Sequence, residues 1–298
     1  MSVIDSNTLF LSGHYLKMPY LVFKGDRSAL TPYYGLVAYG PYELPYTQPR
    51  TILLLYPNSD IFRNTISKVI KALKEGYKKY FPGSFNEIFE VNVDFDNVSI
   101  EYNKYSMYDP DETANVFYDV FTQTCTNPSH CFPIIAINKV PRGLYKSLYT
   151  SIKYKFTIEG VPSQIITYET FSDENTFKWS IFPLGLQIFV KMGGTPFLLH
   201  ERLNTPENET AIIIGFGLSK IHLVNKEIRY VGFALAFEAN GKWRLIKWSP
   251  SPYNRDELPQ MMRKLIIDVI DEVIRGYAIE KPEKIHIICL LYTSPSPR

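Results

Sequence analysis

Hydrophobic positions in the first two thirds of the chain follow two alternating patterns. Short apolar runs typical of strands occur at residues 51–57, 87–95, 132–140 and 163–170. Apolar positions spaced three and four apart predict helices that begin at Ser59 or Asp60, span 111–124 and 143–156, and run from Pro183 to Gly193-Gly194. Repeated strand–helix units predict a mainly parallel sheet covered by helices on both faces, with ligands at its carboxyl edge.

The pattern changes near residue 195. Strand-like runs follow one another without intervening helices at residues 211–217, 228–239 and 241–249. A long helix with one apolar face is predicted over about 255–276, and an apolar strand follows at 284–289. Three meandering strands, a helix and a strand are typical of the beginning of a ribonuclease-H-like fold, which carries a metal-binding carboxylate in its first strand.

Two glycines, Gly215 and Gly217, interrupt the first of these strands. A phosphate-binding loop is a weak interpretation, because Lys220 stands where the dinucleotide fingerprint needs its third glycine. Such loops also require a helix next, whereas another strand is predicted here. The alternative is that Gly217 occupies the place of the first-strand carboxylate.

Composition restricts the functional classes only loosely. The net charge is +2, too small for the whole protein to attract nucleic acid, so any such binding requires a local patch. One candidate is the run from Lys139 to Lys155, with five basic residues and no acidic one, although a solvated face is the simpler interpretation. The high aromatic content suits base stacking, but an aromatic-rich core explains it more simply.

Location and redox state are also predicted from the sequence. The N-terminus shows no signal peptide, and no apolar stretch is long enough to insert in a membrane, so we expect a cytoplasmic protein. The three cysteines, at 125, 131 and 289, predict neither a disulfide framework nor paired zinc ligands. The last eight residues, LYTSPSPR, resemble translated sequencing-adapter sequence, and residues 290–298 are predicted to be non-native.

Five side chains form the most informative candidate site. Tyr149 and Lys153 lie four apart on one predicted helix, as do Gln187 and Lys191 on another, and Gln164 begins a strand between them. A phenol, two ammonium groups and two carboxamides can neutralise a terminal phosphate, donate hydrogen bonds to it and stack on a base. Each residue alone also has a structural interpretation, for example Lys191 offsetting the negative end of its helix.

The run Y-x-x-x-K, followed by G-V-P-S-Q and V-K-M-G-G-T-P, resembles the MID domain of Argonaute proteins. The resemblance implies that Tyr149 stacks on the first guide base. It further implies that Lys153, Gln164 and Lys191 hold the guide 5′-phosphate, assisted by Gln187. In many prokaryotic relatives a divalent cation such as Mg²⁺ bridges that phosphate to the C-terminal carboxylate, so Mg²⁺ is a possible cofactor of the full-length protein.

The later segments IIIGFGLSK and RYVGFALAFEANGKW resemble the opening of a PIWI domain. We therefore expect an α/β protein with a Rossmann-like MID domain and the N-terminal part of a ribonuclease-H-like PIWI domain. The expected boundaries are an N-terminal segment at 1–34, the MID domain at 35–194 and a partial PIWI domain at 195–289. This layout is similar to that of the short prokaryotic Argonautes.

Cleavage activity is not expected. Slicing members of the family begin their carboxylate tetrad with G-[IV]-D, whereas this chain has Gly215-Phe216-Gly217. Glu257 lies near the position of the family's mobile glutamate, but Asn254 and Glu257 also have capping-box spacing, which we favour. The alternative is a guide-dependent endonuclease with a displaced metal ligand, for instance Asp256 or Glu257. A nucleotide-binding module unrelated to guides is a third interpretation.

The resemblance also implies the partners. They are a guide RNA or DNA, a complementary target strand, and a separate effector protein with an APAZ-like region that acts in prokaryotic defence. The predicted function is therefore guide binding by a catalytically inactive protein.

Overall fold

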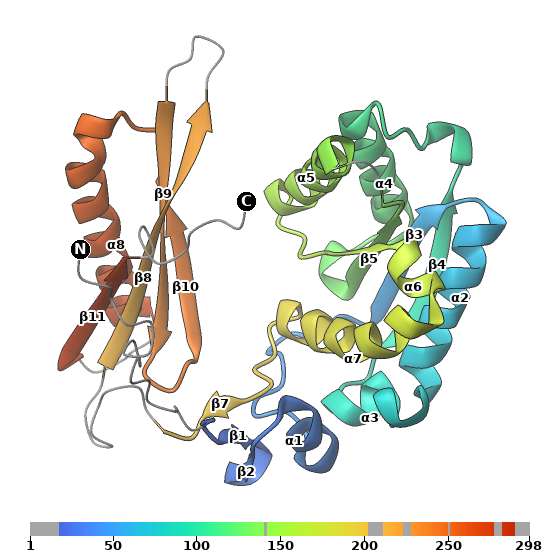
Figure 1. Ribbon diagram of the computed structural model, residues 1–298, viewed down its shortest axis with the longest axis horizontal. Helices are drawn as coiled ribbons and strands as arrows, with labels where there is room; N and C mark the ends of the chain where they lie inside the picture. Colours follow the sequence, from blue (N-terminus) through green and yellow to red (C-terminus); the bar gives the residue numbers. More distant parts are fainter. Residues whose placement is uncertain are drawn as a thin grey trace, which may run out of the picture.

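The computed structural model describes residues 18–139, 142–201, 211–222, 228–249, 251–276 and 282–289. Figure 1 shows two sheet-containing units: a larger one built from the first two thirds of the chain and a smaller one built from the last third. The predicted non-native tail at 290–298 lies outside the described residues, as does the first half of the predicted N-terminal segment. The domain boundaries stay predictions.

A four-stranded parallel sheet forms the centre of the larger unit, as predicted. Its strands lie in the order β4 (Asp94–Ile100), β3 (Thr51–Pro57), β5 (Cys131–Ile137) and β6 (Gln164–Thr167). Each neighbouring pair is parallel, and Ile134 of β5 lies beside Gln164 of β6. Because all four strands run parallel, their carboxyl ends share one edge of the sheet.

Helices cover both faces of this sheet (Figure 1). One face packs on α2 (Asp60–Glu75), α3 (Phe85–Phe89) and α7 (Glu174–Lys191), and the other packs on α4 (Pro110–Thr124) and α5 (Arg142–Ile158). Successive residues of β3 enter opposite cores: Ile52 and Leu54 lie in the first, Leu53 and Leu55 in the second. All four side chains are at most 1% exposed, which explains why a continuous apolar run encodes this strand.

The prediction of a strand at 87–95 was wrong except for its last two residues. Residues Phe85–Phe89 form helix α3 instead, and the strand β4 begins only at Asp94. Ser84 and Glu87 make a reciprocal capping box that starts this helix. Phe85, Ile88 and Phe89 are three and four apart and all buried, so the same apolar residues satisfy a helical face.

Two further boundaries differ from the sequence prediction. Helix α7 begins at Glu174, capped by the side chain of Asp173, and Pro183 lies inside it rather than in its first turn. The predicted strand 163–170 ends at Thr167, and helix α6 (Tyr168–Ser172) follows. At α7 the Asp173 cap determined the helix start more strongly than the proline did, whereas α6 begins without a side-chain cap.

A small antiparallel sheet lies between the two larger units, at the bottom of Figure 1. It contains β2 (Arg27–Ala29), β1 (Leu21–Phe23) and β7 (Leu198–Leu199), with helix α1 (Pro32–Tyr39) packed against it. Short 3-10 helices complete the described elements: η1 (Lys24–Asp26), η2 (Lys78–Tyr80), η3 (Tyr102–Lys104), η4 (Pro128–His130) and η5 (Arg255–Glu257).

The second unit has the predicted order of three strands, a helix and a strand. Its sheet runs β10 (Trp243–Trp248), β9 (Ile228–Glu238), β8 (Ala211–His222) and β11 (Lys284–Cys289). The first two pairings are antiparallel and β11 is parallel to β8. Helix α8 (Leu258–Gly276) packs its apolar stripe on one face of this sheet.

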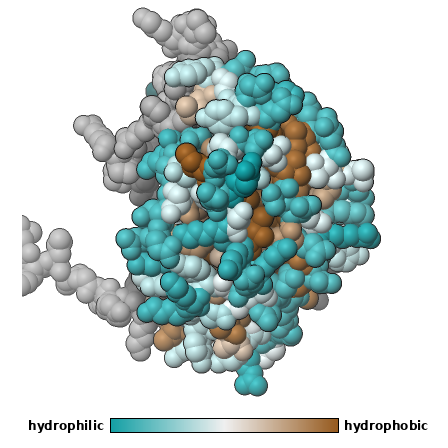
Figure 2. All heavy atoms as spheres, turned by 90° about the vertical axis from the view of Figure 1, so that its right-hand side faces the viewer, coloured by the Kyte–Doolittle hydropathy of each residue, from teal (hydrophilic) through white to brown (hydrophobic). Residues whose placement is uncertain are grey.

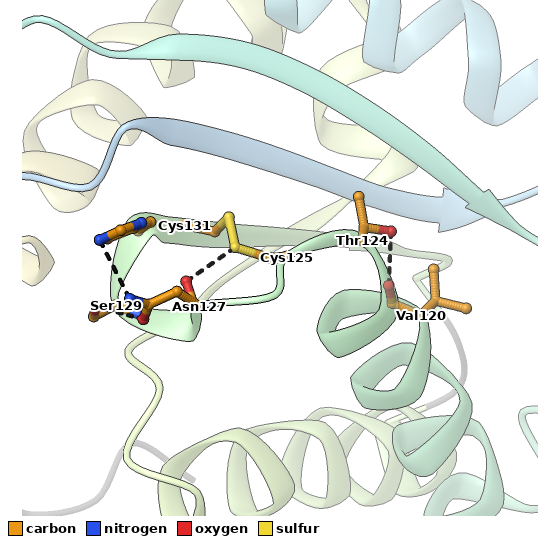
Figure 3. Close-up of a disulfide and its surroundings, with 7 residues drawn as sticks. Val120, Thr124, Cys125, Asn127, Ser129 and Cys131 are labelled. Atoms are coloured by element: carbon orange, nitrogen blue, oxygen red, sulfur yellow. Dashed lines mark hydrogen bonds between the residues drawn. A yellow bond between two sulfur atoms is a disulfide. The ribbon is translucent and has the colours of Figure 1, made fainter.

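The sequence prediction about cysteine was wrong for one pair. Figure 3 shows a disulfide between Cys125, just after α4, and Cys131, the first residue of β5. Their Cα atoms are 6.4 Å apart, within the usual range for such a bond. The number and spacing of the cysteines did not predict this disulfide, because it depends on the turn at 126–130, which brings the two residues together.

Surface polarity fits a folded unit with few apolar patches. On the face of the larger unit turned away from the second sheet, hydrophilic atoms surround a narrow hydrophobic strip (Figure 2). Among the described residues, no helix combines the length and apolar character needed to cross a membrane.

Candidate functional site

Two lysines from different helices meet at one backbone carbonyl. Lys153 lies in the last part of α5 and Lys191 is the last residue of α7. The ammonium groups of both donate to the carbonyl oxygen of Ser163, Lys191 over 3.0 Å, and Lys153 also contacts the Ser163 hydroxyl at 3.2 Å. Two like charges therefore share one acceptor at the start of β6.

Gln164 holds the second lysine in place. Its side-chain carbonyl accepts a 2.6 Å hydrogen bond from Lys191, and its amide nitrogen donates to the Ile165 carbonyl at 2.9 Å. The residue is only 8% exposed, so its orientation is fixed by packing as well as by these two bonds. The structure thus brings Lys153, Gln164 and Lys191 together around Ser163.

The electrostatics of this lysine cluster (Lys153, Lys191, Ser163 and Gln164) are unfavourable without a further partner. Partial burial lowers the pKa of Lys153 to about 7, and the nearby positive charge of Lys191 contributes to the same shift. Partial burial also lowers the pKa of Lys191. Among the described residues, no carboxylate forms an ion pair with either ammonium group. A bound anion would relieve both the repulsion and the loss of hydration.

The other two predicted residues lie beside the cluster. Tyr149 precedes Lys153 by one turn of α5, and 40% of its surface is exposed. Gln187 precedes Lys191 by one turn of α7 and is exposed. Gln164 and Gln187 line the same cavity of 290 Å³, so the two carboxamides face a common space. Within the described residues, the side chain of Gln187 makes no hydrogen bond to either lysine.

Ser163 is the contributor that sequence reasoning missed. It is 4% exposed, and both its carbonyl and its hydroxyl accept from the lysines. The turn Gly160-Val161-Pro162 places it, since Gly160 has a positive φ of 70° and Val161 donates back to the Phe156 carbonyl. The G-V-P-S-Q run already marked this turn, but a backbone acceptor leaves no side-chain signature.

The donor set of the cluster suits an anion and not a bare divalent cation. Ammonium, amide and hydroxyl groups neutralise and hydrogen-bond phosphate, whereas Mg²⁺ prefers several oxygen ligands including carboxylates. The described residues contain no group of three His, Cys, Asp or Glu side chains placed to bind a metal. Any Mg²⁺ here would need the phosphate itself and an additional carboxylate as ligands.

The glycine pair has a different role from a phosphate loop. Both Gly215 and Gly217 lie inside the continuous strand β8, opposite Leu235 and Phe233 of β9. A Cβ atom at Gly217 would lie 2.3 Å from the ring of Phe233, whereas a Cβ atom at Gly215 would have nothing within 4 Å. The Phe233 ring therefore covers the position where a side chain at 217 would lie.

Glu257 is engaged in the cap that the sequence predicted. Its carboxylate accepts a 2.8 Å hydrogen bond from the backbone amide of Asn254, and the Asn254 side chain accepts in return from the backbone N–H of Glu257. The side chain is thus bound to its own helix terminus.

The fold and cluster together define a class of α/β protein: a parallel Rossmann-like sheet with a cationic cluster between two helices, followed by a mixed ribonuclease-H-like sheet. The Piwi domain model matches residues 137–289, just over half of the chain, and the chain belongs to the Argonaute/Piwi family. The match spans both the lysine cluster and the second sheet.

Individual relatives are distant. A Piwi protein from Archaeoglobus fulgidus is 24% identical over 249 residues, which are 84% of this chain and 50% of that protein. Clostridium butyricum Argonaute, solved with a guide DNA and a target DNA, matches 92% of this chain and 36% of its own at 17% identity, with a TM-score of 0.63. Marinitoga piezophila Argonaute, solved with a 5′-OH guide RNA, matches 92% and 40% at 14% identity, with a TM-score of 0.58.

The relatives differ from this chain in length but share its fold. The chain spans about half the length of the curated relative and less than half of these solved structures. At such identities the structural matches establish a common fold for the MID and PIWI regions.

Proposed function

We propose that this protein binds the 5′-phosphorylated end of a guide RNA or DNA and presents the guide to a complementary target strand. Sequence recognition then comes from base pairing and not from contacts between the protein and base edges. Family membership supports this function, and two solved relatives carry guides. The lysine cluster is the observation that carries the proposal.

In this proposal the phosphate oxygens replace the Ser163 carbonyl as hydrogen-bond acceptors of the two lysines. In the cluster, Lys153 and Lys191 donate to the carbonyl of Ser163, which carries only a partial charge. A phosphate dianion offers several charged oxygens, so each ammonium group gains a shorter and stronger bond when it turns towards the phosphate. In this proposal Tyr149, one turn away, stacks on the terminal base, and Gln187 donates from the neighbouring turn.

We further propose that the protein does not cleave its target and that a separate effector protein acts after target binding. Gly217 carries no ligand atom for a metal ion, and the Phe233 ring fills the adjacent space. Glu257 is held in a helix cap. Cleavage of a guide-paired target that depends on Mg²⁺ or Mn²⁺ would overturn this part of the proposal and establish a displaced metal ligand.

The test of guide binding compares lysine variants on matched oligonucleotides. Lys153→Ala and Lys191→Ala should each weaken binding of a 5′-phosphorylated guide by roughly 1.5–3 kcal/mol, the range for a charge-assisted hydrogen bond. The same guide with a 5′-hydroxyl should lose much less. Fluorescence anisotropy at constant salt measures both, because salt alone changes such affinities strongly.

Lys155→Ala is the matched control. Lys155 lies on the same helix as Lys153, but its ammonium group pairs with Glu159 at 3.0 Å. Its removal changes the net charge equally and should leave the preference for a 5′-phosphate intact. Equal losses for phosphorylated and hydroxyl guides in the Lys153 and Lys191 variants would contradict the assignment of the cluster.

A further inference from the structure

The lysine cluster holds more positive charge than its surroundings stabilise. The side-chain nitrogens of Lys153 and Lys191 both donate to the carbonyl oxygen of Ser163, so the two nitrogens lie close together. Within the part of the chain that the structure describes, neither of them forms an ion pair with a carboxylate. Two like charges at one acceptor disfavour each other, so one of the two amines loses its proton more readily than an exposed lysine does.

The contacts of the two amines indicate which one becomes neutral. Lys191 also donates a 2.6 Å bond to the side-chain carbonyl of Gln164, and it ends helix α7, where the helix dipole favours a cation. Lys153 lies more than one turn from either end of α5. Its second contact is the Ser163 hydroxyl, which can donate to a lone pair as well as accept. Lys153 is therefore the amine that releases its proton, and its pKa of about 7 agrees with this assignment.

A neutral lysine amine beside a cation is a nucleophile. Partial burial and a neighbouring positive charge activate lysines in this way, because only the unprotonated amine carries a free lone pair. At pH 7 about half of Lys153 is neutral at a pKa of about 7, against about 1 in 3,000 for a lysine at the usual 10.5. The Lys153 side chain is only half-buried, so its nitrogen is not sealed from small molecules.

The surroundings of Lys153 determine which electrophiles the site favours. Lys191 carries the charge and Gln164 orients it, so a phosphate group is the part of a small molecule that the cluster holds best. Space adjoins these residues, since Lys191 lines a cavity of 260 Å³ and Gln164 lines the cavity of 290 Å³. An acyl phosphate meets both requirements. Its phosphate pairs with Lys191, and its carbonyl carbon, separated from the phosphorus by one oxygen, lies next to the neutral amine.

We propose that Lys153 is a site of covalent acylation by small acyl phosphates. The lone pair of its Nζ attacks the acyl carbon, the bond between this carbon and the bridging oxygen breaks, and phosphate leaves with the electron pair. The proton that the nitrogen loses goes to the departing phosphate, directly or through water, and an amide remains on Lys153. Lys191 neutralises the charge of the leaving phosphate. The acylation itself does not depend on guide binding.

Acylation changes the charge of the lysine cluster. An amide is uncharged and has one N–H donor where the ammonium group has three, so the cluster keeps only the positive charge of Lys191. The consequence for nucleic acid rests on the proposed guide binding. Acetylated protein should bind a 5′-phosphorylated guide roughly 10–150-fold more weakly than unmodified protein, the loss expected for Lys153→Ala. The level of acyl phosphate thereby controls how much of the protein can load a guide.

The experiment incubates the guide-free protein with acetyl phosphate at pH 7 and follows each lysine by peptide mass spectrometry. Lys153 should be acetylated at least about tenfold faster than Lys155, since its larger neutral fraction outweighs the weaker nucleophilicity of a less basic nitrogen. Lys155 is the matched control, because it lies on the same helix and its hydrogen bond to Glu159 raises its pKa. Equal rates at the two lysines would overturn the inference.

Two further measurements test the recognition of the phosphate. Inorganic phosphate should slow the acetylation of Lys153 and leave that of Lys155 unchanged, because only the first depends on an anion held by Lys191. Lys191→Met removes both the neighbouring charge and the phosphate partner, so the rate at Lys153 should fall to that at Lys155. A rate at Lys153 that responds to neither change would also overturn the inference. The comparison within the native protein requires no substitution, so it decides the matter if this variant fails to fold.

Guide oligonucleotides separate this inference from the proposed function. A 5′-phosphorylated guide should protect Lys153 from acetylation, whereas a 5′-hydroxyl guide should protect it much less. Fast acetylation of Lys153 without such protection would support the acylation site and contradict guide binding at the cluster. Slow acetylation of Lys153 in a protein that binds phosphorylated guides tightly would overturn the acylation and leave guide binding intact.

Discussion

The lysine cluster at the end of helix α7 and Gly217 in the middle of strand β8 differ in whether the protein's own side chains satisfy the site. At the first, Lys153 and Lys191 approach each other with a lowered pKa and no carboxylate ion pair among the described residues. At the second, Gly217 removes a side chain altogether and Phe233 packs over it. Charge gathered without compensation indicates an external anion, whereas a space filled by the protein's own ring leaves no room for a ligand.

The comparison separates binding from chemistry within one chain. A ligand site is unfavourable in free energy while it is empty, since the charge repulsion and the lost hydration persist until the anion binds. A position without a side chain can be filled by ordinary packing, and the aromatic ring of Phe233 over Gly217 is such packing. The following predictions test this difference, from the largest expected effect to the smallest.

Introducing a carboxylate at Gly217 should destabilise the second unit. Gly217→Asp forces a Cβ atom to within 2.3 Å of the Phe233 ring and buries a charge, so the free energy of unfolding should fall by about 2–4 kcal/mol. Chemical denaturation measures it. Gly215→Ala, whose Cβ meets nothing within 4 Å, is the control and should change stability by less than about 1 kcal/mol.

Removing the ring should relieve that clash. Gly217→Asp combined with Phe233→Ala should be more stable than the sum of the two single changes, as expected for residues in contact. A stable Gly217→Asp protein that cleaves a guide-paired target would show instead that the ring moves aside readily.

Reducing the disulfide between Cys125 and Cys131 should weaken the first unit. The bond closes a short loop, for which the loss is about 2–3 kcal/mol in the chain-entropy model. Trp179 is the only tryptophan of that unit, so its fluorescence in a Trp243→Phe, Trp248→Phe background follows unfolding there. Thermal unfolding with and without a reductant gives the shift.

The disulfide also borders the lysine cluster. Cys131 and Lys191 line one cavity of 260 Å³, together with Val161 and Pro162 of the turn before Ser163. A double Cys125→Ala, Cys131→Ala protein should be insensitive to the reductant. Equal melting with and without a reductant in the native protein would mean that the bond does not contribute to stability.

Guide affinity should depend on pH because of Lys153. Its pKa of about 7 means that binding above neutral pH must first supply a proton, so affinity should fall as pH rises from 7 to 8, by up to about fivefold. Lys153→Arg should flatten this profile, because guanidinium stays charged. A native profile as flat as that of Lys153→Arg would contradict the lowered pKa.

The same group affects folding with a defined sign. Because the folded pKa lies below the usual 10.5, the unfolded chain binds more protons between about pH 7 and 10.5, and this residue makes stability rise with pH over that range. Lys153→Met should remove that rise, as followed by denaturation at several pH values.

The smallest effect should come from Gln187. Its side chain is exposed and makes no recorded bond to the lysines, so Gln187→Ala should weaken guide binding by at most about 1 kcal/mol. Gln164→Ala should weaken it more, because Gln164 orients Lys191. A larger loss for Gln187→Ala than for Gln164→Ala would indicate that the phosphate binds closer to the 290 Å³ cavity than to the Ser163 carbonyl.

Much of the fold was predictable because its strands and helices have regular apolar patterns. The runs at 51–57 and 132–140 are continuous because both faces of the sheet are covered, and the helices at 111–124 and 143–156 have one apolar face each. Residues 87–95 failed because Phe85, Ile88 and Phe89 satisfy a helix once Ser84 caps it. A local cap outweighed an alternating pattern.

The site was predictable to the extent that it resides in side chains. The spacing of Tyr149, Lys153, Gln187 and Lys191 on two helices carried a family resemblance, and the structure places both lysines together. Ser163 was not predictable, because its contribution is largely a carbonyl. The pairing of Cys125 with Cys131 was missed because it depends on a turn. The Phe233 ring over Gly217 depends on strand register, which spacing within one strand cannot give.

The shared carbonyl of Ser163 has a consequence for how fast and how firmly a ligand is captured. Flexible lysines normally lose rotamer freedom when they grasp an anion, and that loss subtracts from affinity. Here both ammonium groups already donate hydrogen bonds to the same backbone oxygen and lie close to each other. Most of this ordering thus takes place during folding, so the two lysine side chains lose little further rotamer freedom when a phosphate binds.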